Sequence, residues 1–391
     1  MTDPSAKKRG EALLRFRGGV VGAVLPFGFF LFGVMTLGLS GAPVETGFWP
    51  VLLGALMLGL LLARDRQAYS ETMLAGMSRP LVMVLVMAWL LAGVLGTLLA
   101  ESGLVESLVW LGRVTAVSGG GYVVAAFLIT ALVSTATGTS LGTILVCAPM
   151  LYPGGTGMGA DPAMLMGAII GGATFGDNVS PVSDTTIASA NTQGADMGGG
   201  VRSRMRYALP ASLLALLVFG FWGGGVQAPD GQALGAEAGP AGLIMLLVPA
   251  LVIFLLVRRR HLIEGLMMGI LGAVGLGLVT GQYGWSQLFY VDYDAFSASG
   301  LILTGMERGV GVSIFTILLM GLVAALEGAG IVERMVNAAT RGATSPAQAE
   351  WRIFATVSAA VILTTHAAVA ILSVGALTRD AGRRFGLSAY R

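Results

Sequence analysis

The chain contains few charged residues. They make up only 11% of its 391 residues, whereas a soluble globular chain has about 25%. Hydrophobic residues make up 55%, and the mean hydropathy is +0.81. A disordered chain would be more polar, and a soluble fold could not bury this much apolar surface, but a lipid bilayer accepts it. The composition therefore predicts an integral membrane protein that has the bilayer as a partner.

Residues that form disulfides or bind metals are also scarce. The single cysteine, Cys147, excludes an intramolecular disulfide framework and a zinc site built on cysteines. The two histidines, His261 and His366, give no metal cluster, and no paired carboxylates or catalytic triad stand out. The glycine runs lack the Gly-Lys-Ser/Thr of a phosphate loop, and no basic surface suits nucleic acid. We expect no enzymatic activity, no cofactor and no nucleic-acid partner.

Long apolar runs recur along the whole chain. A helix needs about 20 residues to cross the hydrocarbon core, so we expect an all-α polytopic membrane protein with about ten to twelve membrane segments. The expected spans are 19–40, 48–63, 78–100, 120–150, 162–192, 209–225, 240–257, 262–280, 309–327 and 351–376, with shorter apolar stretches at 103–116 and 328–340.

Basic residues indicate the orientation, because cytoplasmic loops are enriched in lysine and arginine. Residues 1–18 are basic and are predicted to be cytoplasmic, as are Arg64–Arg66, Arg202–Arg206, Arg258–His261 and the tail from Arg379. The connections at 41–47, 152–161 and 226–239 contain no lysine or arginine and should lie outside.

The two halves of the sequence resemble each other weakly. Leu74–Met77 matches Leu303–Met306, and Gly103–Glu106 matches Gly330–Glu333, with offsets of 229 and 227 residues. Because the charges give the halves opposite directions, we expect an inverted-repeat secondary transporter. Residues 19–226 would form the first repeat, 227–239 an external linker, and 240–391 a second repeat that is incomplete at its C-terminus, as in a truncated chain. Chance similarity between Gly- and Leu-rich helices is the alternative.

The most informative segment is residues 171–190, where polar groups interrupt an apolar run. Ionisable residues at membrane depth are costly and by default indicate function. Pro181 and Gly176 favour a broken helix, whose freed carbonyls would suit a hard cation. The predicted ion-site residues of this segment are Asp177, Asn178, Ser180, Ser183, Asp184 and Thr185.

A carboxylate here would bind either Na⁺ or a proton, so we predict a Na⁺ site at Asp177 and Asp184. The alternative is structural: Asp184 would be the N-cap of a half-helix starting near Thr185.

A second polar segment covers residues 134–143 and includes the candidates Thr137, Thr139 and Ser140. Gly138 and Gly142 favour a hairpin turn or a helix break that presents hydroxyls, whereas close helix packing is the alternative. The 227-residue offset pairs this segment with Thr364, Thr365 and His366. His366 is a candidate proton relay or a hydrogen-bonded packing residue. Glu327 is the best candidate for a buried role among the acids near span ends.

The run from Phe175 to Thr186, together with Thr137–Thr143 upstream, resembles the signature of NhaC-type Na⁺/H⁺ antiporters of the ion transporter superfamily. The resemblance implies a bacterial inner-membrane antiporter with inverted repeats, broken helices or re-entrant hairpins, and an ion site at the Asp177–Thr185 positions. Resemblance to the superfamily also implies a homodimer.

The sequence leaves four functions to weigh. Exchange of Na⁺ for H⁺ by alternating access is expected first. The alternative is a Na⁺- or H⁺-coupled carrier of a small organic anion or amino acid, although no buried arginine is evident to bind its carboxylate. A non-transporting membrane scaffold would not need polar groups at membrane depth, and a channel suits inverted repeats less well.

Overall fold

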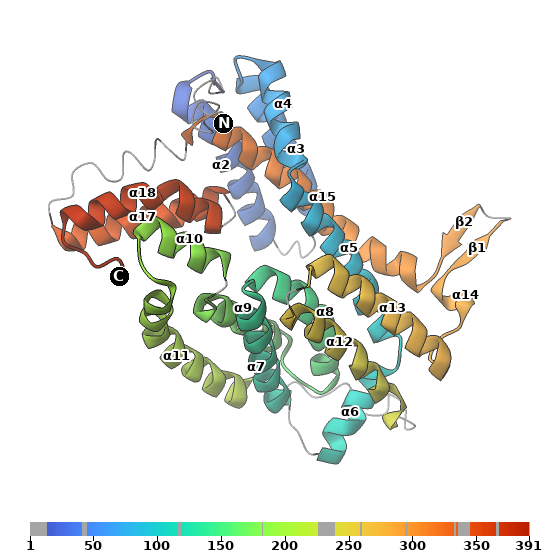
Figure 1. Ribbon diagram of the computed structural model, residues 1–391. Helices are drawn as coiled ribbons and strands as arrows, with labels where there is room; N and C mark the ends of the chain where they lie inside the picture. The colour runs from blue at the N-terminus through green and yellow to red at the C-terminus, as the bar shows by residue number, and fades with distance from the viewer. Residues whose placement is uncertain are drawn as a thin grey trace, which may run out of the picture. The chain divides into compact units, whose positions relative to one another are not determined.

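The computed structural model describes residues 14–40, 45–115, 119–181, 183–225, 239–258, 260–293, 296–331, 334, 345–364 and 367–390. Most of these residues are helical (Figure 1). Within the described residues, five helices are long and apolar enough to cross a membrane: α2 (Gly19–Leu39), α5 (Pro80–Ala100), α11 (Met197–Trp222), α13 (Leu262–Thr280) and α15 (Leu301–Gly328). Shorter apolar helical stretches cover Thr46–Leu62, Gly119–Thr135 and Pro240–Leu256.

Large apolar side chains cover the outer faces of these helices. Phe32 of α2, Phe221 of α11 and Val279 of α13 are all more than two-thirds exposed. Soluble proteins do not present apolar faces of this extent to water. The prediction of an all-α polytopic membrane protein is therefore confirmed.

The chain forms two compact units. Unit 1 comprises Met1–Val86, Gly311–Ala389 and Arg391, and unit 2 comprises Met87–Val310 and Tyr390. The helices α5 and α15 contribute residues to both units.

Unit 1 contains η1 (Glu45–Phe48), α3 (Trp49–Leu62), α4 (Arg66–Met77), α17 (Pro346–Thr364) and α18 (Ala367–Arg384), besides α2 and the ends of α5 and α15. Its core is built around Phe27, Leu52, Tyr69 and Leu326. The buried Tyr69 hydroxyl donates a hydrogen bond of 3.0 Å to the carbonyl of Leu56, as a buried phenol requires.

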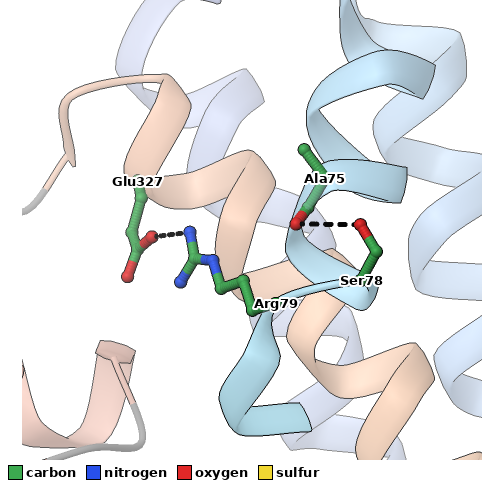
Figure 2. A network of polar contacts seen from close by, with 4 residues as sticks. All are labelled: Ala75, Ser78, Arg79 and Glu327. Atoms are coloured by element: carbon green, nitrogen blue, oxygen red, sulfur yellow. Dashed lines mark hydrogen bonds and ion pairs between the residues drawn. The ribbon is translucent and has the colours of Figure 1, made fainter. Parts of the chain in front are cut away.

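An ion pair connects the start of α5 with α15 inside unit 1. Figure 2 shows the Arg79 guanidinium pointing to the Glu327 carboxylate, with 2.5 Å between Nη2 and Oε2. Nearby, the Ser78 hydroxyl donates to the carbonyl of Ala75. Glu327 therefore has a partly buried structural role.

Unit 2 contains α6 (Leu104–Thr115), α7 (Gly119–Thr137), α8 (Ser140–Gly157), α9 (Pro162–Val179), α10 (Asp184–Gln193), α11, η2 (Pro240–Leu246), α12 (Leu247–Val257), α13 and α14 (Trp285–Leu288). A small antiparallel hairpin pairs β1 (Tyr290–Asp292) with β2 (Ser297–Ser299), with Tyr290 opposite Ser299. The helices α7 and α9 pack closely because Gly172 and Gly176 of α9 have no side chain that would separate the two helices.

The structure changes several of the expected spans. The expected spans at 120–150 and 351–376 are wrong as single helices, because α7 and α8 occupy the first region, and α17 and α18 occupy the second. Gly142 does not end a helix, since α8 runs through it. The α11 helix begins at Met197, well before the expected 209, and includes the basic residues 202–206.

Candidate functional site

The first helix break in unit 2 separates α7 from α8. Gly138 has a φ of 72°, a left-handed conformation that glycine adopts without steric cost. Thr139 is the N-cap of α8, and its hydroxyl accepts a 3.3 Å hydrogen bond from the amide of Gly142. The expected break in the 134–143 segment is confirmed.

The second break separates α9 from α10. The α9 helix ends at Val179, and Ser180 is extended. Pro181 follows, with no backbone N–H to continue a helix. Ser183 is extended and serves as the N-cap of α10, which begins at Asp184. The predicted broken helix is therefore confirmed, although the N-cap position belongs to Ser183 instead of Asp184.

Hydrogen bonds to Asp177 bring the two breaks together. The Ser140 hydroxyl, in the first turn of α8, lies 3.0 Å from Oδ2 of Asp177. The Ser183 hydroxyl, at the start of α10, lies 2.5 Å from Oδ1. Ser183 also contacts the Thr185 hydroxyl at 2.8 Å. The carboxylate at the end of α9 thus joins the starts of two other helices.

A second set of contacts fixes the end of α9 against α7. The buried Ser180 hydroxyl donates to the carbonyl of Thr135 at 2.8 Å, and the buried Ser134 hydroxyl donates to the carbonyl of Ala173 at 2.5 Å. A Cβ on Gly176 would lie 2.4 Å from the carbonyl oxygen of Ala131. These contacts fix the end of α9 and so position Asp177. Ser180 contributes by anchoring the extended segment after α9 to α7.

Arg204 of α11 is a candidate site residue that could not be recognised in the sequence. Its guanidinium is partly buried and donates to the hydroxyls of Thr186 at 2.7 Å and Ser189 at 2.5 Å, both on α10. It also lies within electrostatic range of Asp177. The basic run 202–206 indicated only orientation, because nothing in it distinguishes Arg204 from its exposed neighbours Arg202 and Arg206.

The other predicted residues lie less centrally. Thr137 is partly buried and contacts the Thr143 hydroxyl at 3.4 Å. Thr139 and Asn178 are exposed, and Asn178 contributes its carbonyl to Arg204 at 3.4 Å. The side chains of Asp184 and Thr364, and all of Thr365 and His366, lie outside the described residues.

The geometry suits a small hard cation. One carboxylate and three hydroxyl oxygens, from Ser140, Ser183 and Thr185, lie within a chain of hydrogen bonds. Hard cations prefer oxygen ligands of these kinds. The break also leaves backbone carbonyls without helical partners, as in other transporter sites built on discontinuous helices.

Comparison with known proteins gives the family. The sequence profile described as "Na+/H+ antiporter family" matches residues 21–223, which is more than half of the chain. The chain belongs to this Na⁺/H⁺ antiporter family. The matched region contains both helix breaks and the two serines, Ser140 and Ser183, whose hydroxyls contact Asp177.

The relatives that match this chain are named as antiporters of different substrates. The Na⁺/H⁺ antiporter NhaC of Alkalihalophilus pseudofirmus is 26% identical over 280 residues, covering 68% of this chain and 58% of that protein. The malate-2H⁺/Na⁺-lactate antiporter of Bacillus subtilis is 24% identical, covering 78% of this chain and 68% of that protein. The arginine/ornithine antiporter ArcD of Halobacterium salinarum is 24% identical, covering 77% and 60%. The chain thus spans about three-fifths of the first of these relatives.

Proposed function

We propose that the protein exchanges Na⁺ for H⁺ across a bacterial inner membrane, with Asp177 as the shared binding group. The observation that carries this proposal is the double hydrogen bond that the Asp177 carboxylate accepts from Ser140 and Ser183. Family membership and the similarity to NhaC antiporters support the same activity.

Competition at one carboxylate couples the two ions. With Na⁺ bound, the Ser140 and Ser183 hydroxyls turn their oxygen lone pairs to the ion, beside the ionised Asp177. With a proton bound, Asp177 is neutral, and its attraction for Na⁺ is lost. Because the site holds one ion or the other, each transport cycle that carries Na⁺ in one direction returns a proton in the other.

Alternating access requires one part of the transporter to move against another, and the proposed internal repeat would provide the two parts. The boundaries of α7 and α8 recur in α17 and α18 with a constant shift of 227 residues: Gly119 and Pro346, Thr137 and Thr364, Ser140 and Ala367, Gly157 and Arg384. Gly103 and Gly330, which share the same spacing, both have positive φ. This regularity supports a repeat, and its inversion stays a prediction.

The proposal is tested by measuring ΔpH dissipation in everted vesicles after addition of Na⁺, Li⁺ or K⁺. We expect Na⁺ to dissipate the gradient and Asp177→Asn to abolish the response. Asp161→Asn is the matched control, because Asp161 caps the opposite end of α9 through Met164 and asparagine caps equally well. Full activity of Asp177→Asn would exclude the proposed site.

A second candidate function is Na⁺- or H⁺-coupled transport of a small organic anion or amino acid, and Arg204 favours it. The partly buried Arg204 guanidinium, beside Thr186 and Ser189, could form a bidentate pair of hydrogen bonds with a carboxylate. Two of the relatives above are named as antiporters of malate with lactate and of arginine with ornithine.

Uptake of labelled dicarboxylates, monocarboxylates and amino acids separates the two candidates. If the substrate is an organic anion, Arg204→Gln should abolish uptake, whereas the exposed Arg206→Gln should leave it unchanged. If only Na⁺ dissipates ΔpH and no organic solute is taken up, the second candidate is excluded.

The orientation and assembly belong to the same proposal. The basic residues before α2 support a cytoplasmic N-terminus. A homodimer stays a prediction, as do the absence of enzymatic activity and of a cofactor.

A further inference from the structure

A basic cavity of about 690 Å³ lies in unit 1, and its lining residues differ from those that contact Asp177 in unit 2. Its wall includes three arginines, Arg15, Arg64 and Arg334, and one acid, Asp65. Apolar groups of Leu14, Val20, Ala23 and Ile331 complete much of the remaining wall. The cavity therefore combines a positive charge with an apolar side.

The backbone holds two of these arginines directly opposite each other. The chain before α2 runs antiparallel to the α3–α4 connection: the amide of Arg17 donates to the carbonyl of Leu62 at 2.7 Å, and that of Arg64 to the carbonyl of Arg15 at 2.9 Å. Phe16 pairs with Ala63 in this ladder, and both are buried in the core. Since side chains alternate along a strand, Arg15 and Arg64 both project to the other face.

Like charges placed directly opposite across a ladder repel each other. Within the described residues, none of the three arginines forms an ion pair. The one acid in the wall is already engaged, because Asp65 is the N-cap of α4 and accepts a 3.0 Å hydrogen bond from the amide of Ala68. The repulsion between Arg15 and Arg64 is therefore not offset by any described part of the protein.

The start of α2 adds to the positive potential. Gly19 and Val20 of its first turn line the cavity, no side chain caps this helix end, and its first turn contains no acid. The N-terminus of a helix favours anions through its free N–H groups and its dipole.

We propose that this cavity binds a phosphate group, either the headgroup of an anionic phospholipid or free inorganic phosphate. Guanidinium groups bind phosphate oxygens in paired hydrogen bonds, and basic pockets between membrane helices bind anionic headgroups. The apolar wall formed by Leu14, Val20 and Ile331 would contact the glycerol and acyl carbons of a lipid. The phosphate offsets the repulsion between Arg15 and Arg64 and holds the start of α2 to the α3–α4 connection.

The test uses the full chain, purified in neutral detergent, with phosphatidylglycerol, phosphatidylcholine and inorganic phosphate as separate probes. Native mass spectrometry measures retained lipid, and thermal unfolding measures the shift of the midpoint with each probe. We expect phosphatidylglycerol to be retained and to raise the midpoint, whereas phosphatidylcholine does neither. A rise with inorganic phosphate alone would assign the site to the free anion, and a rise only with the lipid would assign it to a headgroup.

The double variant Arg15→Gln/Arg64→Gln should lower the affinity for the bound probe about tenfold or more, since both charge-assisted contacts are lost. Arg66→Gln is the matched control, because Arg66 is exposed at the start of α4, two residues after Arg64, and does not line the cavity. If the double variant does not fold, Arg334→Gln tests the same wall from another segment. Equal retention of both lipids with no response to phosphate, or wild-type affinity in the variants, would overturn the proposal.

Discussion

The hydroxyls that reach Asp177 both belong to residues at helix starts. Ser183 occupies the N-cap of α10 but makes no side-chain capping bond there. Its hydroxyl instead donates to the carboxylate at 2.5 Å. Ser183 thus makes no local capping bond, which supports the proposal that its contact with Asp177 belongs to an ion site.

Replacement of Ser183 by alanine should therefore affect transport more than folding. We expect the apparent KM for Na⁺ to rise about three- to tenfold, since one hydrogen bond contributes about 1 kcal/mol. The measurement is Na⁺-dependent ΔpH dissipation, with thermal unfolding of the same preparation.

Thr174→Ala is the control for this variant. Thr174 is exposed on α9, and its hydroxyl bonds only within the helix, to the carbonyl of Ile170. A similar rise in KM for both variants would contradict the assigned role of Ser183.

The part of the site that could be predicted from the sequence is the part that local chemistry determines. Asp177, Ser183 and Thr185 stand out because they are polar within an apolar run, and Pro181 indicates the break. Arg204 could not be recognised, because its role depends on α11 packing against α10 after a turn. The exposed position of Asn178 also depends on which face of α9 meets α7.

At the scale of elements, the packing of α9 on α7 rests on two glycines. A Cβ on Gly172 would lie 2.1 Å from the hydroxyl oxygen of Thr130, and one on Gly176 would lie 2.4 Å from the carbonyl oxygen of Ala131. The Thr130 side chain could rotate away, but the Phe127 carbonyl oxygen also lies 2.3 Å from a Cβ on Gly172. The backbone carbonyls of Phe127 and Ala131 cannot move without shifting α7, so the two helices would have to separate.

Gly176→Ala should accordingly lower the free energy of unfolding by about 1–3 kcal/mol, the usual cost of overpacking. Gly167→Ala, on the same helix, is the control, because its Cβ would meet only the Phe219 ring at 3.7 Å. Alanine there should be neutral or stabilising, since it favours helix over glycine. The comparison is made by thermal unfolding in detergent, and equal stability of the two variants would contradict the close packing.

The ion pair between Arg79 and Glu327 connects the turn before α5 with α15 inside unit 1 (Figure 2). Its side chains are 38% and 26% exposed, so solvent screens part of the attraction. A double-mutant cycle with Arg79→Gln and Glu327→Gln should give a coupling of about 1 kcal/mol. A coupling near zero, measured by thermal or denaturant unfolding, would show that the pair adds nothing to stability.

Several elements could be predicted from the sequence because hydrophobicity alone determines them. The spans expected at 19–40, 48–63, 78–100 and 262–280 match α2, α3, α5 and α13 within about two residues at each end. The α4 helix and the hairpin at 290–299 were not expected, because neither contains a long apolar run. The hairpin in particular depends on pairing between Tyr290–Asp292 and Ser297–Ser299.

At the scale of the whole molecule, the native cysteine permits a clean test of orientation. Cys147 is fully buried, so it should not react with a membrane-impermeant thiol reagent. Gln67→Cys, beside the basic residues 64–66, should react only in everted vesicles. Tyr293 lies after α13 and is 82% exposed. A Tyr293→Cys variant should therefore react only in intact cells. The opposite pattern would contradict the proposed cytoplasmic N-terminus.

Competition between Na⁺ and H⁺ for Asp177 is central to the proposed exchange. The most direct test is the apparent KM for Na⁺ measured in proteoliposomes as a function of pH, for the wild type and for Asp161→Asn. Competition predicts that the KM rises as pH falls, approaching about tenfold per pH unit once the carboxylate is mostly protonated, with little change in the maximal rate. An apparent KM that is independent of pH, or that falls as pH falls, would contradict a shared site.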